Sequence, residues 1–190
     1  MKSSRVYLSI GSNIGDRESN IAQAISALEV SEKNYNLDSA SFYLTEPLYN
    51  PNQEFFINTV VGLDTYLKPF EFLDHIQDIE LMLGRKRSLK KNMPRTIDID
   101  ILVHGSAVME TEELIIPHPG LINRKFVLIP FDEIATDFKI PHINLTVNEL
   151  LGRCPDRAMV KLYELELSLI HISEPTRLLS IAVSGVGVKK

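Results

Sequence analysis

Hydrophobic and polar residues alternate in several short segments of the chain. Period-two patterns and runs of β-forming residues predict strands at residues 6–10, 39–45, 56–65 and 97–102. In the strand at 56–65, we expect the face that carries Ile57, Val61 and Leu63 to pack on the core. Shorter apolar runs predict two more strands, around residues 107–109 and 114–116.

Two longer segments carry apolar residues at helical spacing. Ile21, Ala24 and Leu28 fall at i, i+3 and i+7 of a helix that reaches about residue 30, and Asp16 is a suitable N-cap for it. The second helix is expected over residues 69–83, because proline suits a first turn and Gly84 suits the position after the last one. A short final helix is expected at residues 148–153.

The order strand, helix, strand, strand, helix, strand is typical of a ferredoxin-like sandwich. We therefore expect an α+β fold in which helices flank a mostly antiparallel sheet. We assign residues 1–167 to this one domain. Residues 168–190 lack clean periodicity and resemble translated adaptor sequence without defined structure, so they are left out of the fold prediction. An unusual native extension is the alternative.

The composition narrows the class of protein. The chain has 190 residues, a hydrophobic content of 44% and a net charge of −5, as in an ordinary soluble domain. Its single cysteine, Cys154, excludes an intramolecular disulfide and a multi-cysteine zinc site. The acidic balance argues against a nucleic-acid partner. The absence of a signal-peptide core or a membrane-spanning run predicts a cytoplasmic location and no membrane association.

The strand at 97–102 carries the strongest chemical signal. Ile97, Ile99 and Ile101 alternate with Asp98 and Asp100, so both carboxylates lie on one face, with Cα atoms roughly 6.6 Å apart. Two like charges at this spacing are unfavourable unless something neutralises them. Mg²⁺ does so well, because proteins usually hold it with one or two carboxylates and substrate phosphates.

A basic segment leads into this strand. Between residues 84 and 97 the chain has six cations and no acid, namely Arg85, Lys86, Arg87, Lys90, Lys91 and Arg95. Guanidinium groups bind phosphate oxygens in bidentate pairs, so the segment and the acidic strand together suit a metal-bound triphosphate. A solvated basic loop beside a polar edge strand remains the alternative.

Four other polar residues stand at informative positions. Asn58 lies in mid-strand, where its amide could read the edge of a heterocycle or bond a neighbouring loop. Gln77 and Glu80 share one face near the end of the second helix, which is either functional or solvated. His118 lies between two prolines in an expected surface loop, where a structural role is the alternative to a functional one.

Several separated stretches together resemble one family. They are residues 8–13, 41–48, 56–58, 77–80, 84–85, 94–100, 117–118 and 123–126. In this order and spacing they resemble 6-hydroxymethyl-7,8-dihydropterin pyrophosphokinase of folate biosynthesis, over about residues 5–160. The sequence Pro-Arg-Thr-Ile-Asp-Ile-Asp at 94–100 is the most specific of them.

The resemblance implies transfer of pyrophosphate from ATP to the hydroxymethyl oxygen of 6-hydroxymethyl-7,8-dihydropterin, with release of AMP. It implies that Asp98 and Asp100 bind two Mg²⁺ ions and that Arg85 and Arg95 close over the triphosphate. These four form the implied catalytic set. The implied partners are the two small-molecule substrates, and we expect a monomer.

The resemblance also implies two groups of substrate contacts. The pterin would be bound by Thr45, Leu48, Phe56, Asn58 and Phe126, with the two phenyl rings stacked on the bicycle. ATP would be bound by Gln77, Glu80, Arg85, Arg87, Arg95, Ile101, His118 and Arg124.

The sequence departs from the family pattern at several positions. Phe56 replaces a frequent tyrosine, and Asn92 stands where some members have a tryptophan. Glu113, Ile115 and Pro119 stand where some members have arginine, threonine and tyrosine, so we expect weaker nucleotide contacts there.

Two other functions stay open. Asp-x-Asp also occurs in metal-dependent transferases that bind nucleotide-sugar diphosphates. A non-catalytic module that binds an anionic partner through the basic segment is the second alternative.

Overall fold

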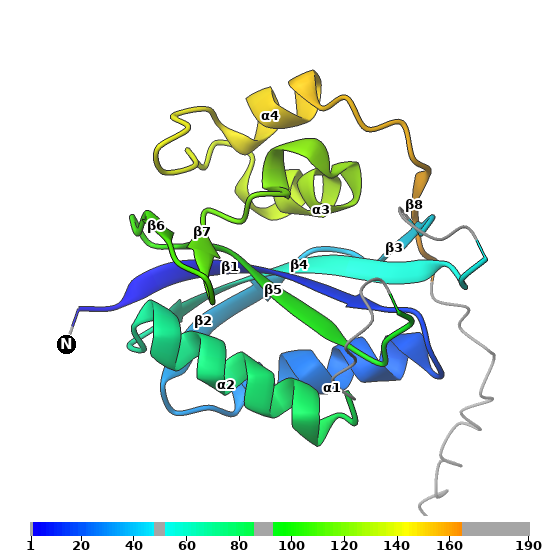
Figure 1. The fold of residues 1–190 in the computed structure, drawn as a ribbon, viewed down its shortest axis with the longest axis horizontal. Helices are drawn as coiled ribbons and strands as arrows, with labels where there is room; N and C mark the ends of the chain where they lie inside the picture. Colours follow the sequence, from blue (N-terminus) through cyan, green and yellow to red (C-terminus); the bar gives the residue numbers. More distant parts are fainter. Residues whose placement is uncertain (1, 48–51, 86–92, 165–190) are drawn as a thin grey trace, which may run out of the picture.

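The computed structural model describes residues 2–47, 52–85 and 93–164, and a six-stranded sheet forms its centre (Figure 1). The strands are β1 (Ser4–Ser12), β2 (Asn34–Ser39), β3 (Tyr43–Thr45), β4 (Phe56–Thr65), β5 (Asp98–His104) and β8 (Val160–Leu162). They lie in the order β5-β1-β4-β3-β8, and β2 also pairs with β4. Every pairing among them is antiparallel, which confirms the predicted α+β class.

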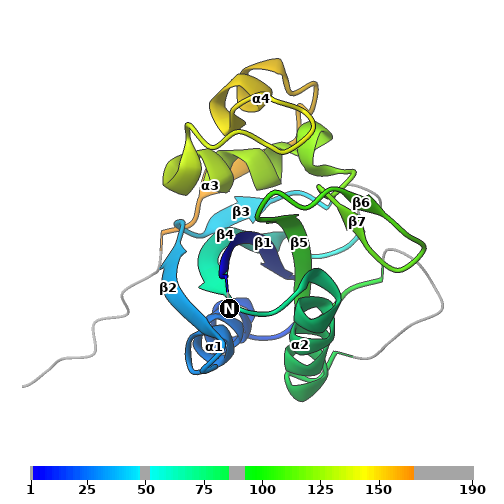
Figure 2. The same ribbon diagram turned by 90° about the vertical axis from the view of Figure 1, so that its left-hand side faces the viewer.

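Helices cover both faces of the sheet (Figures 1 and 2). On one face lie α1 (Arg17–Glu29) and α2 (Pro69–Met82), and on the other lie α3 (Lys125–Ala135) and α4 (Val147–Arg153). The Asp16 side chain accepts a hydrogen bond from the Ser19 N–H and caps α1, and Gly84 has a φ of 82° just after α2. Both helix boundaries therefore follow the sequence signals.

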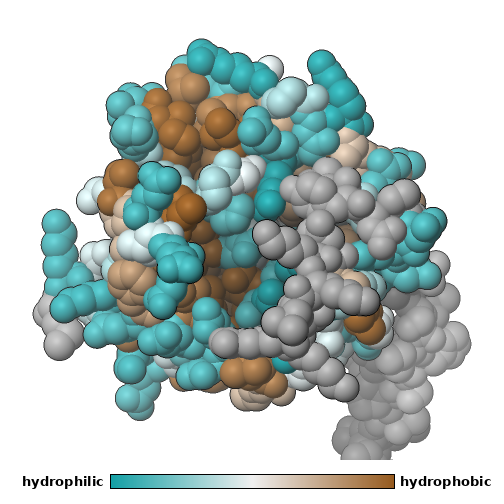
Figure 3. Space-filling view, in the orientation of Figure 1, coloured by the Kyte–Doolittle hydropathy of each residue, from teal (hydrophilic) through white to brown (hydrophobic). Residues whose placement is uncertain are grey.

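The sheet separates two hydrophobic clusters. The cluster under α1 and α2 includes Ile57, Val61 and Leu63, the face of β4 expected to be core, together with Ile97, Ile99 and Ile101. The cluster under α3 and α4 includes Tyr7, Val60, Leu102 and Phe131. On the face of the molecule seen in Figure 3, hydrophobic side chains show in the upper layer and again in the middle and at the lower edge of the view, with hydrophilic side chains between them.

Several elements differ from the sequence prediction. The strand expected at 39–45 is two strands, because the chain leaves β4 after Ser39 and rejoins it at Tyr43. Most of β2 was missed, since Asn36 has a φ of 52° and a register shift interrupts the alternation. The strand expected at 107–109 is β6 (Met109–Glu110), which pairs with β7 (Ile115–Ile116) in a separate small sheet.

The region after β7 contains a short 3₁₀ helix, η1 (Leu121–Asn123), and then α3. Helix α3 continues through Pro130, which is buried, although proline lacks the N–H of a regular helix bond. The final strand β8 was not predicted, because three residues carry too short a pattern. No helix in the described part of the chain has the length and apolar character needed to cross a bilayer.

Candidate active site

The candidate site lies on the part of the sheet that α3 leaves uncovered. Tyr7 on β1 and Val60 on β4 face α3 and are buried. Further along the same face come Ser9 and Gly11 on β1 and Asn58 on β4, which line a cavity. One end of this sheet face therefore packs against α3 in the core, and the other end forms the bottom of the cavity.

Strand register brings the two chemical signals of the sequence together. Gly11 is paired with Asn58 on β4 and with Asp98 on β5, so one row across three strands reads Asn58, Gly11, Asp98. Two inter-strand spacings separate the outer members by about 10 Å. An amide and a carboxylate therefore face one cavity across a residue with no side chain.

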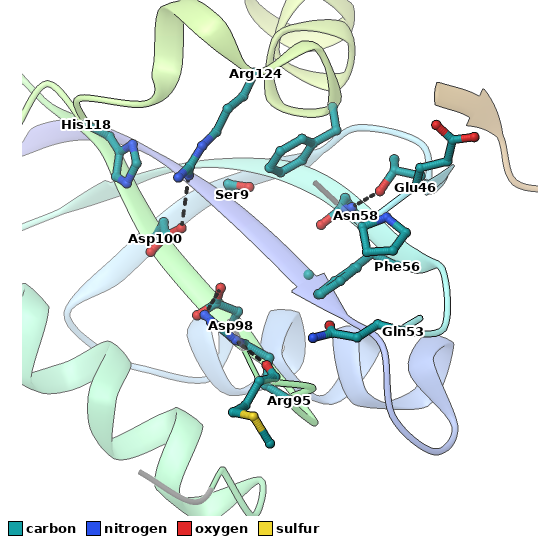
Figure 4. A pocket seen from close by; sticks show the side chains of 15 residues that line it. Ser9, Glu46, Gln53, Phe56, Asn58, Arg95, Asp98, Asp100, His118 and Arg124 are labelled. Carbon is teal, nitrogen blue, oxygen red and sulfur yellow. Dashed lines mark hydrogen bonds and ion pairs between the residues drawn. The ribbon is translucent and has the colours of Figure 1, made fainter. Parts of the chain in front are cut away.

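The cavity has a volume of about 280 Å³. Its lining comes from β1, β3, β4, β5, the start of α3 and the loops beside them, and consists of Ser9, Gly11, Thr45, Glu46, Pro47, Gln53, Phe56, Asn58, Met93, Arg95, Asp98, Asp100, His118, Arg124 and Phe126. Figure 4 shows the charged side chains Arg95, Asp98, Asp100 and Arg124 on one side, and Phe56 and Asn58 on the other. We call the first side the charged end and the second, which is mainly aromatic and amide, the neutral end; the exposed Glu46 is the one acid among its described lining residues.

Arginine–carboxylate pairs organise the charged end. Asp98 is 2.8 Å from an Arg85 guanidinium nitrogen and 2.5 Å from an Arg95 nitrogen. Arg124 approaches Asp100 to 3.9 Å from the α3 side (Figure 4). Burial, followed by the neighbouring Asp98 charge, raises the pKa of Asp100 to about 6. A cation bound between the two carboxylates would oppose the effect of both causes, because a nearby opposite charge favours the ionised form.

Glu80 supports the charged end from α2, outside the cavity lining. It is buried on α2, accepts a hydrogen bond of 2.7 Å from the Ile99 N–H, and forms an ion pair with Arg85. Burial raises the pKa of Glu80 to about 7, although the Arg85 charge opposes this. Glu80 thereby ties the end of α2 to β5 and gives Arg85 a second carboxylate partner beside Asp98.

Asp98 and Asp100 fit a hard cation. Both carboxylates face the cavity, and oxygen ligands of this kind suit Mg²⁺. Over residues 2–47, 52–85 and 93–164, no group of three or more His, Cys, Asp or Glu side chains is arranged to hold a metal. A pair of carboxylates is sufficient for Mg²⁺ that takes its other ligands from phosphates and water.

His118 reaches the same end as a neutral donor. Its Nδ1 accepts a hydrogen bond of 3.0 Å from the Gly120 N–H, so the ring proton resides on Nε2. Burial and the nearby Arg124 lower the pKa of His118 to about 4. The imidazole is therefore uncharged at neutral pH and presents an N–H, which suits a phosphate or nucleotide oxygen.

The neutral end is organised around Asn58. Its Nδ2 donates a hydrogen bond of 2.6 Å to the Thr45 hydroxyl, and its side chain is nearly inaccessible. Gly11 makes room for it, because a Cβ at Gly11 would lie 2.3 Å from the Asn58 Oδ1. Phe56 and Phe126 line the cavity beside this amide. The combination suits a flat, polar-edged ring.

Asn13 links the two ends from outside the cavity. It is buried, and its Oδ1 accepts a hydrogen bond of 2.8 Å from the Arg95 N–H. Its Nδ2 donates a bond of 3.1 Å to Gln53, a lining residue. The turn after β1 thus fixes the backbone at Arg95 relative to the loop before β4.

Comparison with known proteins identifies the family. The family model described as 7,8-dihydro-6-hydroxymethylpterin-pyrophosphokinase (HPPK) matches residues 7–136. The 2-amino-4-hydroxy-6-hydroxymethyldihydropteridine pyrophosphokinase of Haemophilus influenzae is 35% identical over 156 residues, which cover 82% of this chain and 96% of the relative. The Bacillus subtilis protein of the same name is 43% identical over 129 residues, 68% of this chain and 77% of the relative. The chain belongs to the HPPK family.

As a member of this family, the chain is an enzyme of the pyrophosphokinase class. Some longer proteins contain an equivalent region. The Schizosaccharomyces pombe folic acid synthesis protein fol1 is 38% identical over 162 residues, 85% of this chain but 22% of the relative. A crystal structure of Plasmodium falciparum HPPK-DHPS with pteroate matches 80% of this chain and 42% of its own, with a TM-score of 0.62 and 16% identity. At that identity the structure supports the fold alone.

Most of the site residues expected from the sequence line the cavity, and Glu80 and Arg85 contact its charged end. Leu48, Arg87 and Asn92 lie outside the described residues. The Ile101 side chain packs in the core on the opposite face of β5 from Asp98 and Asp100, and the nucleotide contact expected of Ile101 stays a prediction. Gln77 is half-buried on α2 and is not among the described residues that line the cavity.

Of the positions where the sequence departs from the HPPK pattern, Phe56 lines the cavity. Glu113, Ile115 and Pro119 are exposed, and none of the three is among the described lining residues.

Several lining residues had no predicted role. They are Ser9, Gly11, Glu46, Pro47, Gln53 and Met93. Ser9 and Gly11 lie in stretches that carried the family resemblance, and their small size on a buried strand was the available signal. Glu46, Pro47 and Gln53 belong to the loop between β3 and β4, whose course cannot be read from alternation.

Proposed function

We propose that this HPPK-family chain transfers the β,γ-pyrophosphoryl group of ATP to the hydroxymethyl oxygen of 6-hydroxymethyl-7,8-dihydropterin in folate biosynthesis. The hydroxymethyl oxygen forms a bond to the β-phosphorus, the bond from that phosphorus to the α-phosphate oxygen breaks, and AMP leaves. The row Asn58, Gly11, Asp98 carries the proposal, because it sets a heterocycle-reading amide and a metal-binding carboxylate at opposite ends of one cavity.

The pterin occupies the neutral end. Asn58 presents its Oδ1 to the ring edge, since its Nδ2 is engaged by Thr45. Phe56 and Phe126 stack on the ring faces, where planar aromatic contacts are favourable. Rejection of a wrong ring follows from the cost of leaving the buried amide unpaired.

The triphosphate occupies the charged end. Asp98 and Asp100 would hold two Mg²⁺ ions, whose chemistry would be to neutralise phosphate charge and to polarise the phosphoryl group. Arg85, Arg95 and Arg124 supply guanidinium groups, and the His118 Nε2–H donates to an oxygen of the nucleotide. Positioning and charge neutralisation are the main needs of phosphoryl transfer, and these residue types provide both.

The charge distribution and the family suggest the setting of the enzyme. We expect a monomer in the cytoplasm that binds its two small-molecule substrates and neither nucleic acid nor membrane. We also expect residues 1–167 to form the functional unit, with residues 168–190 dispensable.

AMP formation tests the proposal. Purified protein is incubated with ATP, Mg²⁺ and the hydroxymethyl pterin, and each component is omitted in turn. AMP release that requires both pterin and Mg²⁺ supports the proposal. A metal-dependent transferase of nucleotide sugars would release no pterin-dependent AMP, and a non-catalytic module would bind no ATP analogue in a Mg²⁺-dependent way in calorimetry. Either result contradicts the proposal.

A further inference from the structure

A segment beyond α4 passes along both walls of the neutral end. We call residues 156–162 the C-terminal strap; it contains β8 and lies outside the range 7–136 that the family model matches. Figure 1 shows β8 beside β3 at the edge of the sheet, below the chain that descends from α4. The strap therefore joins the helical layer to the strand that carries Thr45.

The first contact of the strap is with the start of α3. The Asp156 Oδ2 accepts a hydrogen bond of 3.0 Å from the Lys125 N–H, and its Oδ1 accepts one of 2.9 Å from the Ala158 N–H. Lys125 is the first residue of α3, so its N–H has no acceptor within the helix. The N-cap residue Arg124 makes no capping side-chain bond, and Asp156 supplies the missing acceptor from 31 residues away.

The cap fixes the residue that follows it. Phe126 is the second residue of α3 and lines the cavity. Arg124 is the N-cap residue, and its guanidinium lies against Gly120, where a Cβ would be 2.5 Å from the Arg124 Nε; its guanidinium carbon is also 6.0 Å from the centroid of the Phe126 ring. Because Phe126 belongs to the first turn and Arg124 has this second contact with Gly120, loosening that turn should displace Phe126 more than the guanidinium of Arg124.

The second contact of the strap is with the opposite wall. The Met159 N–H donates a hydrogen bond of 3.2 Å to Glu46 Oε2, and the Glu46 N–H donates one of 3.4 Å to the Met159 carbonyl. Val160 pairs with Thr45 in the β3–β8 ladder. The strap thus holds the Thr45–Glu46 wall and the Phe126 wall at the same time.

We infer that Asp156 is a positioning residue for the pterin subsite: it caps α3, through Phe126 sets one face of the slot, and by way of the strap keeps that face in register with Thr45. This inference rests on the proposed function. It assigns pterin affinity, and not nucleotide affinity, to a residue that touches neither substrate.

The test compares Asp156→Ala with Asp156→Asn and with Asp137→Ala, a change of an exposed carboxylate on the same side of the sheet. Loss of a helix cap predicts about a three- to tenfold weaker pterin affinity and higher pterin KM for Asp156→Ala. The affinity for a non-hydrolysable ATP analogue with Mg²⁺ should stay unchanged, as should kcat at saturating pterin. Asp156→Asn keeps one of the two acceptor oxygens, so it can accept from the Lys125 N–H but not from the Ala158 N–H as well, and it should restore part of the loss. Asp137→Ala should match wild type.

A double-mutant cycle with Phe126→Ala tests the route of the effect. Asp156→Ala should add little to the loss of pterin affinity caused by Phe126→Ala, whereas additive losses would overturn the role assigned to Phe126. Equal weakening of pterin and nucleotide binding, or none, would overturn the inference. If Asp156→Ala does not fold, Asp156→Glu, which shifts the acceptor away from Lys125, carries the same expectation. If the wild-type protein binds no pterin, the proposed function is contradicted as well. If the wild type binds pterin normally and Asp156→Ala has the same pterin affinity, only the inference is contradicted.

Discussion

The two ends of the cavity are built from different interactions. The charged end is a set of ion pairs in which Asp98 contacts both Arg85 and Arg95, and Arg124 faces Asp100. The neutral end is built mainly on two aromatic rings and the hydrogen-bonded pair Asn58 and Thr45. The charged end is held by ion pairs whose partners a ligand can replace, and the neutral end is shaped by side-chain packing.

This difference predicts different binding behaviour. When a metal-bound triphosphate binds, Asp98 must give up its ion pairs with Arg85 and Arg95 to contact the metal, and the two guanidinium groups then contact the phosphates. Part of the binding energy therefore replaces ion pairs that the free protein already has. The pterin instead enters a slot in which the Asn58 amide is already oriented, so little reorganisation opposes binding. Variants that separate the two ends test this contrast.

The largest effect is expected from the carboxylates of the charged end. Asp100→Asn or Asp98→Asn keeps the side-chain size but removes a charge that a cation needs, so turnover should fall at least about a thousandfold. Pterin-dependent AMP formation measures this loss, and calorimetry should show near-normal pterin binding. Asp74→Asn, at an exposed position on α2, is the control. Near-normal turnover in either pocket variant would argue against their metal role.

The next effect is expected at the neutral end. Gly11→Ala would place a Cβ 2.3 Å from the Asn58 Oδ1 and push the amide away from Thr45. Pterin KM should rise about ten- to a hundredfold, at a stability cost of about 1–3 kcal/mol. Metal-bound nucleotide should bind almost as before. In Gly152→Ala, by contrast, the added Cβ meets nothing within 4 Å, so steady-state kinetics of that variant should be normal. Equal kinetics for the two variants would remove the steric argument.

A pH series separates the ends without mutation. The pKa of Asp100 is raised to about 6, so its carboxylate is mostly ionised at pH 7 and mostly protonated at pH 5. Because the protonated form binds cations poorly, Mn²⁺ affinity without nucleotide should fall about tenfold over this range. Asp100→Asn should flatten the dependence, and pterin affinity should vary little. A Mn²⁺ titration that is equally tight at both values would contradict the assignment.

The smallest effect is expected from the end of the chain. Removing residues 168–190 should leave pterin affinity, nucleotide affinity and turnover within about twofold of the full chain, because terminal segments outside a domain tolerate change. Thermal melting and steady-state kinetics of the two lengths provide the measurement. A large loss at one end of the cavity alone would show that this segment contributes to that end.

The sequence was most informative where a residue carries its own chemistry. Asp98 and Asp100 could be placed on one face because a strand has a period of two, and the structure directs both into the cavity. The same periodicity puts the Ile101 side chain on the opposite face, in the core, so the nucleotide contact that the resemblance implies for Ile101 stays a prediction.

The rest of the site depends on contacts between distant segments. Gly11 belongs to the site because strand register places Asn58 on one side of it and Asp98 on the other. This register depends on all three strands and cannot be predicted from the sequence of β1 alone. Asp156 reaches Lys125 across 31 residues, which no short motif records. Both become visible only when the sheet and its helices are assembled.

The position of each strand in the sheet gives the two ends different mobility. Strand β4 carries Phe56 and Asn58 and pairs with β1 along one edge and with β2 and β3 along the other. Helices lie on both sides of it, except where Phe56 and Asn58 face the cavity. Strand β5 carries Asp98 and Asp100 at the edge of the sheet, with β1 as its one strand partner among the described residues. Amide hydrogens of β4 should exchange with deuterium only on global unfolding, whereas those of β5 exchange through local opening. The strand that reads the pterin ring should therefore open less often than the strand whose carboxylates face the phosphates of ATP.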